Sequence, residues 1–179
     1  NLSKKFNDVY AVNNINFEIK SNNTVGLLGP NGCGKTTSIG MMLGLIKPTS
    51  GQVIIQNKNI DTIDRNKLLS IMNFASPYVE LPKKLSVKQN LQIYGRLYGI
   101  SDLKLRIDEL AEDLNLKDFL NKKTGELSSG QKNRVSLAKS LINRPEILLL
   151  DEPTASLDPD IGDYVRSYVQ SYKSKNKVT

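Results

Sequence analysis

Residues 29–37 constrain this chain more than any other segment, because their sequence GPNGCGKTT fits the pattern G-x-x-x-x-G-K-[ST]. The apolar run at 25–28 predicts a buried strand before the pattern, and apolar residues at helical spacing in 37–46 predict a helix after it. A strand, a glycine-rich loop and a helix in this order form the setting in which the pattern binds phosphate. A turn that binds nothing explains the glycines, but not the lysine, the threonine and the flanking elements together.

The residue types of the loop indicate how it holds phosphate. Glycines permit backbone conformations that are closed to other residues, so successive N–H groups can turn toward an anion at the start of the helix. Lys35 is expected to reach the β and γ phosphates, and the hydroxyl of Thr36 is expected to bind Mg²⁺. The predicted nucleotide-binding residues of the loop are Gly29, Pro30, Asn31, Gly32, Cys33, Gly34, Lys35, Thr36 and Thr37.

Composition limits the class of protein. Of the 179 residues 39% are hydrophobic and 24% charged, and no apolar run approaches the roughly 18 residues of a membrane span. Cys33 is the only cysteine, which excludes a disulfide framework and favours a reducing, cytoplasmic setting. The net charge of +7 suits nucleic acid, an anionic membrane surface or ATP. Because the lysines are scattered and form no basic helix stripe, we expect no nucleic-acid partner.

Strands are expected before and after the loop. Two strands are predicted at 2–6 and 10–19, separated by a turn at Asn7 and Asp8. A shorter strand is predicted at 52–56, with a turn at 57–59.

From 77 to 126 the sequence becomes helical and offers no good strand candidate. Ser86 and Gln89 have the spacing of a capping box that opens a helix, and Ser101 is expected to cap the next helix. We interpret 77–126 as an α-helical lobe inserted into an α/β core formed by 1–76 and 127–179. A helical layer of the same core is the alternative.

A second group of polar residues follows the lobe. Ser128 and Gln131 again have capping-box spacing. The apolar strand expected at 147–150 ends in Asp151 and Glu152, and the carboxyl ends of strands in open α/β sheets carry the chemistry, so both acids are expected beside the phosphate loop. Asp151 can hold Mg²⁺ through water and Glu152 can polarise a water aimed at the γ-phosphate. The alternative is that both acids merely end the strand at solvent.

Together these motifs resemble the nucleotide-binding domain of an ATP-binding cassette (ABC) transporter over essentially the whole chain. The Walker A loop is 29–36, the signature LSSGQ is 127–131 with Ser129 in place of the first glycine, Walker B is 147–152 and the D-loop is 156–158. The resemblance implies a P-loop NTPase (RecA-like) core with an N-terminal antiparallel β layer and an inserted α-helical lobe. It also implies an ATP-hydrolysing subunit that powers a transporter, and the stretch 91–100 is similar to exporter-type members.

The same resemblance implies partners and further site residues. Two such domains meet head to tail in a homo- or heterodimer, so one domain's signature faces the nucleotide of a second nucleotide-binding domain. The helical lobe contacts a transmembrane permease subunit. The protein is then cytoplasmic and peripheral on the inner face of the membrane. Phe6 aligns with the aromatic that stacks on adenine, Tyr10 is a weaker candidate, and burial in the β layer is the alternative for Phe6. Signature and D-loop residues implied at the nucleotide are Ser128, Ser129, Gly130, Gln131 and Asp158.

Two departures from the family pattern concern the γ-phosphate. At the hinge between core and lobe, where the family has a catalytic glutamine, the aligned residue is Ser76, with Asn73 as another possible donor. We hypothesise that activity survives; a many-fold faster ATPase in Ser76→Gln would argue against this. The family's switch histidine is absent, and we expect that the chain is cut, without its initiator methionine, where the histidine-bearing strand begins. A histidine-free, degenerate ATPase is the alternative.

Other ATPase and GTPase classes fit less well. A GTPase needs an N-K-x-D motif, and residues 57–60 lack the aspartate. DNA-repair and chromosome-structuring ATPases separate the signature from the loop by a long coiled coil, for which 38–126 has no heptad region. A soluble ABC-type ATPase acting on ribosomes or as a regulator, without a transmembrane partner, is the remaining alternative.

Overall fold

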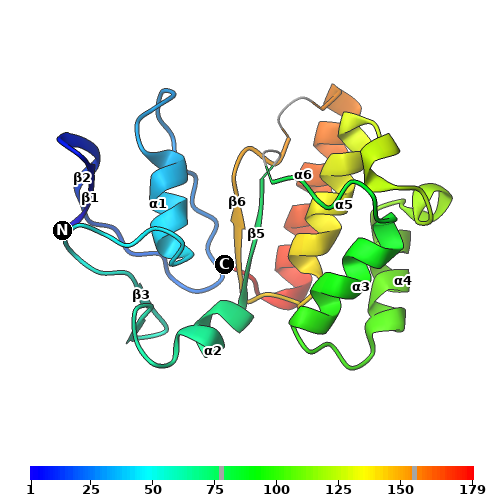
Figure 1. Cartoon of the computed structure of the whole chain (residues 1–179), viewed down its shortest axis with the longest axis horizontal. Coiled ribbons are helices and arrows are strands. Elements are labelled where there is room, and N and C mark those ends of the chain that lie inside the picture. The colour runs from blue at the N-terminus through cyan, green and yellow to red at the C-terminus, as the bar shows by residue number, and fades with distance from the viewer. Residues whose placement is uncertain (77–78, 155–156) are drawn as a thin grey trace. The chain divides into compact units, whose positions relative to one another are not determined.

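A computed structural model describes residues 1–76, 79–154 and 157–179 of the chain. These residues form two compact units, Asn1–Met72 with Thr179, and Asn73–Val178. Figure 1 shows the helices and strands of both units. Among the described residues, no helix is both long and apolar enough to span a bilayer.

The first unit begins with an antiparallel hairpin. Strand β1 (Leu2–Phe6) pairs with β2 (Val9–Ile15), and the turn between them lies at Asn7 and Asp8 as predicted. Asn7 has φ 49°, a left-handed conformation that asparagine tolerates. Strand β2 was expected to run to residue 19, but it ends at Ile15 because its pairing partner at that position, Leu2, is the first residue of β1.

The rest of the first unit consists of short elements. Helix α1 (Lys35–Met42) begins earlier and ends earlier than the predicted 37–46, and α2 (Arg65–Ser70) was not predicted. The strand expected at 52–56 shrinks to β3 (Ile54–Ile55), which pairs with β4 (Lys58–Asn59) around a turn at 56–57. Residues 58–59 are therefore strand rather than turn. The most buried apolar residues are Leu2, Val12, Ile39, Met41, Leu43, Val53, Ile55, Ile60, Leu68 and Met72.

The buried strand predicted at 25–28 is wrong. Within the described chain these residues form no strand, and the side chain of Leu28 is 95% exposed. A strand exists through hydrogen bonds to a neighbour. In the first unit, β1 pairs with β2 and β3 pairs with β4, and neither of these two sheets includes residues 25–28.

In the second unit a two-stranded sheet accompanies a helical cluster. Strand β5 (Met72–Ala75), whose last three residues belong to this unit, is a sheet neighbour of β6 (Ile147–Leu150). The helices are α3 (Val87–Leu97), α4 (Leu103–Asp113), α5 (Ser129–Leu141) and α6 (Pro159–Asn176), with 3₁₀ turns at Lys117–Phe119 and Thr124–Glu126. The predicted helical character of 77–126 is confirmed for its described residues.

Two of the three predicted helix caps are present. In α3 the Ser86 hydroxyl accepts from the Gln89 N–H (3.1 Å), and Gln89 Oε1 accepts from the Ser86 N–H (2.9 Å). Ser128 and Gln131 form the same reciprocal box at the start of α5. The Ser101 cap is wrong, because α4 begins at Leu103 and Ser101 therefore lies one residue outside the cap position.

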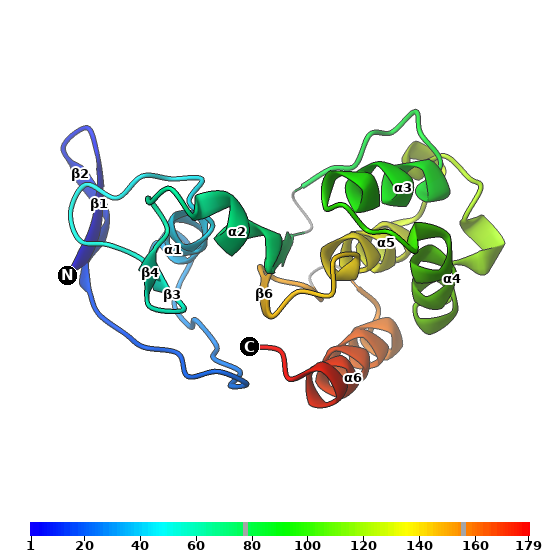
Figure 2. The ribbon, with the colours of Figure 1, turned by 90° about the horizontal axis from the view of Figure 1, so that it is seen from below.

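Two arginines join α4 and α5, which Figure 2 shows side by side in the helical cluster. Arg106 of α4 is buried and donates to the carbonyls of Leu141 and Ile142, at the end of α5. Arg134 of α5 donates to the carbonyls of Leu114 and Asn115, just after α4. Each helix thus satisfies the terminal carbonyl groups of the other, which have no partner within their own helix.

Candidate functional site

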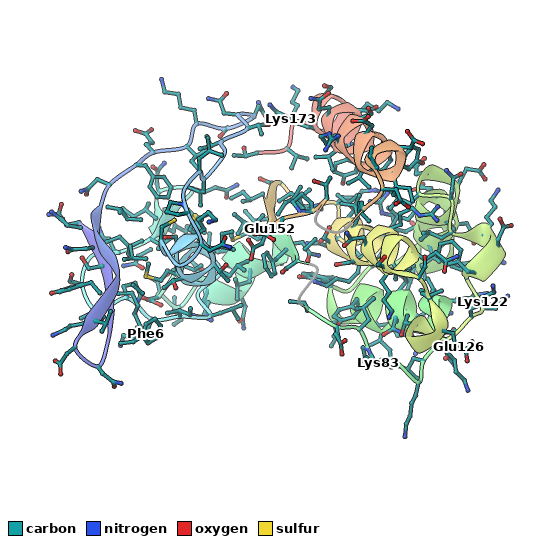
Figure 3. The ribbon with its side chains drawn as sticks, turned by 90° about the horizontal axis from the view of Figure 1, so that it is seen from above. Phe6, Lys83, Lys122, Glu126, Glu152 and Lys173 are labelled. Carbon is teal, nitrogen blue, oxygen red and sulfur yellow. The ribbon has the colours of Figure 1, made fainter. Side chains whose placement is uncertain are left out.

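The predicted site residues are divided between the two units. Phe6 and the loop 29–37 belong to the first unit, whereas Ser76, the signature, Asp151, Glu152 and Asp158 belong to the second. Figure 3 shows the side chains, with Phe6 and Glu152 labelled. The predicted meeting of the two acids with the loop stays a prediction.

The loop has the backbone of an anion-binding turn. Gly32 and Gly34 have φ values of 81° and 94°, which side-chain-bearing residues rarely adopt. Gly34 is the N-cap of α1, no side chain caps the helix there, and its first turn has no acidic residue. The amide groups of this turn and the positive end of the helix dipole therefore fit a phosphate group.

Lys35 is held against the loop that precedes it. Its Nζ donates to the carbonyls of Gly29 (2.8 Å) and Pro30 (3.0 Å), and the Cys33 N–H donates to the Pro30 carbonyl (3.3 Å). The ammonium group thus lies inside the turn that the pattern assigns to phosphate. This donor set fits a nucleotide phosphate, because an ammonium group can exchange carbonyl partners for phosphate oxygens.

Gly34→Ala is expected to destabilise the protein by about 3 kcal/mol. A Cβ at Gly34 would lie 2.3 Å from the Ala11 carbonyl oxygen, and the φ of 94° adds backbone strain. Gly26→Ala is the matched control, because its Cβ meets nothing within 4 Å and its φ is not in the strained range. Urea unfolding measures both, and equal stabilities for the two variants would contradict the prediction.

Phe6 is a surface residue, so the alternative that buries it in the β layer is wrong. Its side chain is 49% exposed, and Lys4 Nζ lies 4.9 Å from the ring centroid. Tyr10 is also exposed and has Lys5 Nζ 5.7 Å from its ring centroid. The hairpin thus offers two aromatic rings beside cations, and the adenine contact of Phe6 stays a prediction.

In the second unit, the two acids after β6 differ in environment. Asp151 is only 6% exposed, and its N–H donates to the Ala75 carbonyl (2.9 Å), which continues the link between β6 and β5. Glu152 is exposed and has φ 49°, an uncommon conformation for a residue other than glycine. The alternative in which both acids end the strand at solvent is therefore wrong for Asp151.

The structure does not by itself assemble a metal centre. Within the described ranges, no group of three or more His, Cys, Asp or Glu side chains could hold a metal ion. The predicted Mg²⁺ ligands are a hydroxyl, Thr36, and a carboxylate, Asp151. Such a donor set suits Mg²⁺, which keeps several waters and takes few protein ligands.

The signature presents the start of α5 at the surface. Ser128 and Ser129 are exposed, whereas Gly130 is buried. A Cβ at Gly130 would lie 3.2 Å from Ile161 Cδ1 of α6, so a small residue allows the two helices to pack closely. The D-loop residue Ser156 lies outside the described residues. Asp158 is exposed and is the N-cap of α6, where it makes no side-chain capping bond.

The hinge serine and the signature line one cavity. Ser76 is 4% exposed and borders a cavity of about 90 Å³. The lining also includes Leu127, the first residue of the signature, and Lys132 and Ser136 of α5. Hinge and signature therefore lie next to each other in this unit.

The sequence-based prediction assigned Asn73 to the wrong role and missed Lys139. Asn73 was considered a spare hinge donor, but its Nδ2 donates to Asn143 Oδ1 (2.8 Å) and to the Lys139 carbonyl (3.3 Å). Lys139 Nζ in turn donates to the Phe74 carbonyl (2.9 Å), and burial lowers the pKa of this lysine. The available signal was a lysine in the apolar stripe that Val135, Ala138 and Ile142 form on α5.

Comparisons with known proteins agree with this geometry. The family model described as "ABC transporter" matches residues 12–155. The chain is 33% identical to the ABC transporter ATP-binding protein NatA of Bacillus subtilis, covering 98% of this chain and 74% of NatA. It is 34% identical to the Nod factor export ATP-binding protein I of Burkholderia lata, covering 99% of this chain but 59% of that protein. The fold is similar to the dimeric ATP-binding cassette MJ0796 bound to ADP and phosphate, with a TM-score of 0.86, 28% identity and coverage of 99% and 82%.

Proposed function

Because this chain belongs to the ABC transporter family, we propose that it is the ATP-binding and ATP-hydrolysing subunit of an exporter-type membrane transporter. The observation that carries the proposal is the loop, in which Lys35 lies inside a glycine turn at an uncapped helix start. The name of the Burkholderia relative supports export, and the nucleotide products in the MJ0796 dimer support hydrolysis.

The residues divide the chemistry between them. We propose that the backbone of 29–34 and the ammonium group of Lys35 bind the phosphates. Thr36 and Asp151 would hold Mg²⁺, and the metal ion would neutralise the negative charge that develops on the phosphates. Glu152 is exposed, and its carboxylate would act as the general base that accepts a proton from the attacking water.

Dimerisation is proposed to complete the site. The start of α5 is exposed at Ser128, and the capping bond uses its oxygen as an acceptor, so the O–H remains a donor for the γ-phosphate bound by a second nucleotide-binding domain. The similarity to a dimeric cassette supports this arrangement. The permease partner and a position at the inner face of the membrane follow from the transporter family and belong to the same proposal.

Ser128→Ala tests this role against a matched control. Both Ser128→Ala and Ser86→Ala remove a capping box of the same geometry, so each is expected to cost about 1 kcal/mol of stability. Only Ser128→Ala is expected to weaken ATP-dependent dimerisation and to lower the ATPase rate, because only Ser128 is proposed to contact nucleotide. Light scattering with Mg-ATP and a phosphate-release assay measure both effects. Equal losses of dimerisation and of ATPase rate in the two variants would show that Ser128 acts only as a structural helix cap.

Slow turnover of this chain is a further part of the proposal. It is supported by Ser76 at the hinge position and by the absence of histidine in the 179 residues. The rates of wild type and Ser76→Gln separate two interpretations. A many-fold faster variant indicates that the native hinge is impaired, and an unchanged rate indicates that the serine is sufficient.

A further inference from the structure

A half-buried lysine lies where β5, α5 and α3 meet. Lys139 is a residue of α5 whose Nζ donates to the Phe74 carbonyl of β5 at 2.9 Å. The same Nζ lies 5.5 Å from the ring centroid of Tyr94 in α3. Partial burial lowers the pKa of this lysine, because it disfavours the charged form. One side chain therefore contacts both the hinge strand and the first helix of the lobe.

The side chain of Asn73 also joins β5 to α5, and here the donor lies on the strand rather than on the helix. The Asn73 side chain of β5 donates to the Lys139 carbonyl and to Asn143, just beyond α5. Its Oδ1 accepts from the Phe74 N–H at 2.8 Å, which fixes the orientation of the amide. Asn73 is 4% exposed. Strand and helix are thus linked by one side chain from each, and each side chain binds the backbone of the other element.

The contacts of Asn73 and Lys139 connect the hinge to the helix that carries the signature. Phe74 of β5 precedes the hinge residue Ser76 by two positions, and Ser76 directly follows the strand. Ser128 caps the other end of α5, about 16 Å away at 1.5 Å of rise per residue. An α-helix is stiff over this length, so the position of its last turns determines the position of its first turn. Any movement of the hinge strand relative to α5 must strain or break the Lys139 and Asn73 contacts.

We infer that Lys139 is a positioning residue that couples the helical lobe and the hinge strand to the signature end of α5. The ammonium group holds the Phe74 carbonyl and the Tyr94 ring in one arrangement, so that Ser76 and Ser128 change position together. Tyr94 contributes its ring, because a cation over an aromatic face is attracted most strongly where water is excluded. This inference rests on the proposed function for its effect on turnover, but the coupling itself is a property of the second unit.

Lys139→Met tests the coupling, with Lys139→Arg as the rescue variant. Methionine is apolar and similar in length, so it removes the charge and the hydrogen bond while it keeps most of the packing volume of the side chain. In the protein expressed from its complete reading frame, kcat is expected to fall roughly tenfold, with KM for ATP within about twofold, because the loop that binds nucleotide is untouched. Arginine restores the donor and the cation, and should restore most of kcat. Lys104→Met, an exposed lysine of α4, is the matched control.

Hydrogen exchange separates coupling from general destabilisation. Lys139→Met is expected to accelerate amide exchange in peptides that cover β5 and α3, with exchange in the β1–β2 hairpin unchanged. A wild-type kcat in Lys139→Met, or a parallel loss of kcat and exchange protection throughout the chain in both Lys139 variants, would overturn the inference. If Lys139→Met does not fold, Tyr94→Leu carries the test, because it removes the ring and leaves the Phe74 hydrogen bond in place. If wild type hydrolyses no ATP, the proposed function fails, and the exchange data still decide the coupling.

Discussion

Lys35→Ala will weaken Mg-ATP binding by at least about 100-fold. The variant loses a charged donor expected to reach two phosphate groups, and hydrogen bonds to charged partners contribute about 1.5–3 kcal/mol each. Isothermal titration with Mg-ATP measures the effect directly. Heat is expected from wild type and none from the variant at the same concentrations.

Folding should change little in this variant, which makes the binding loss interpretable. Lys35 donates to the carbonyls of Gly29 and Pro30, both in exposed residues, so water replaces the ammonium group at little cost. Lys20→Ala removes an exposed lysine of the same unit outside the loop and serves as the control. Wild-type affinity in Lys35→Ala would show that the loop is not the nucleotide site.

Glu152→Gln is expected to lower kcat by about 10²–10⁴-fold while leaving ATP affinity within about twofold. The amide keeps the size of the side chain but cannot accept a proton from the attacking water. Because the binding groups of the loop are unchanged, the loss should lie in the chemical step. Single-turnover phosphate release, together with titration of nucleotide binding, separates the two quantities.

The same variant also tests how ATP and dimerisation are linked. If ATP joins two copies and hydrolysis separates them, Glu152→Gln should remain dimeric in Mg-ATP for longer than wild type. Glu112→Gln is a suitable control, because this exposed acid of α4 pairs with Lys117 at the surface. A turnover in Glu152→Gln equal to that of wild type would exclude Glu152 as the general base.

Local sequence signals predicted the fold best where the interaction itself is local. The two capping boxes appeared at Ser86 and Ser128 because both partners lie within one helical turn. The strand expected at 147–150 was also predicted correctly. The Ser101 cap failed because a serine near a helix start does not fix the residue at which that helix begins.

Pairing and burial were predicted less well, because they depend on distant residues. The run 25–28 has the composition of a buried strand but forms none, since a strand needs a neighbour that its own sequence does not specify. The start of β1 set the length of β2. Phe6 is exposed because the hairpin leaves its side chain uncovered. Asn73 was the plainest case, because its polarity suggested a hinge donor while its amide is bonded to the end of α5.

The sequence by itself determined the family, the phosphate-binding loop and the order of the four motifs, because each motif is a short run whose residue types and spacing are fixed by its chemistry. Only the tertiary structure decided that Lys35 lies inside the loop turn, that Asp151 is buried while Glu152 is exposed, and that hinge and signature border one cavity. It alone revealed the link between Asn73 and Lys139. These features join residues far apart along the chain, and the free energy of such contacts depends on packing that no local pattern encodes.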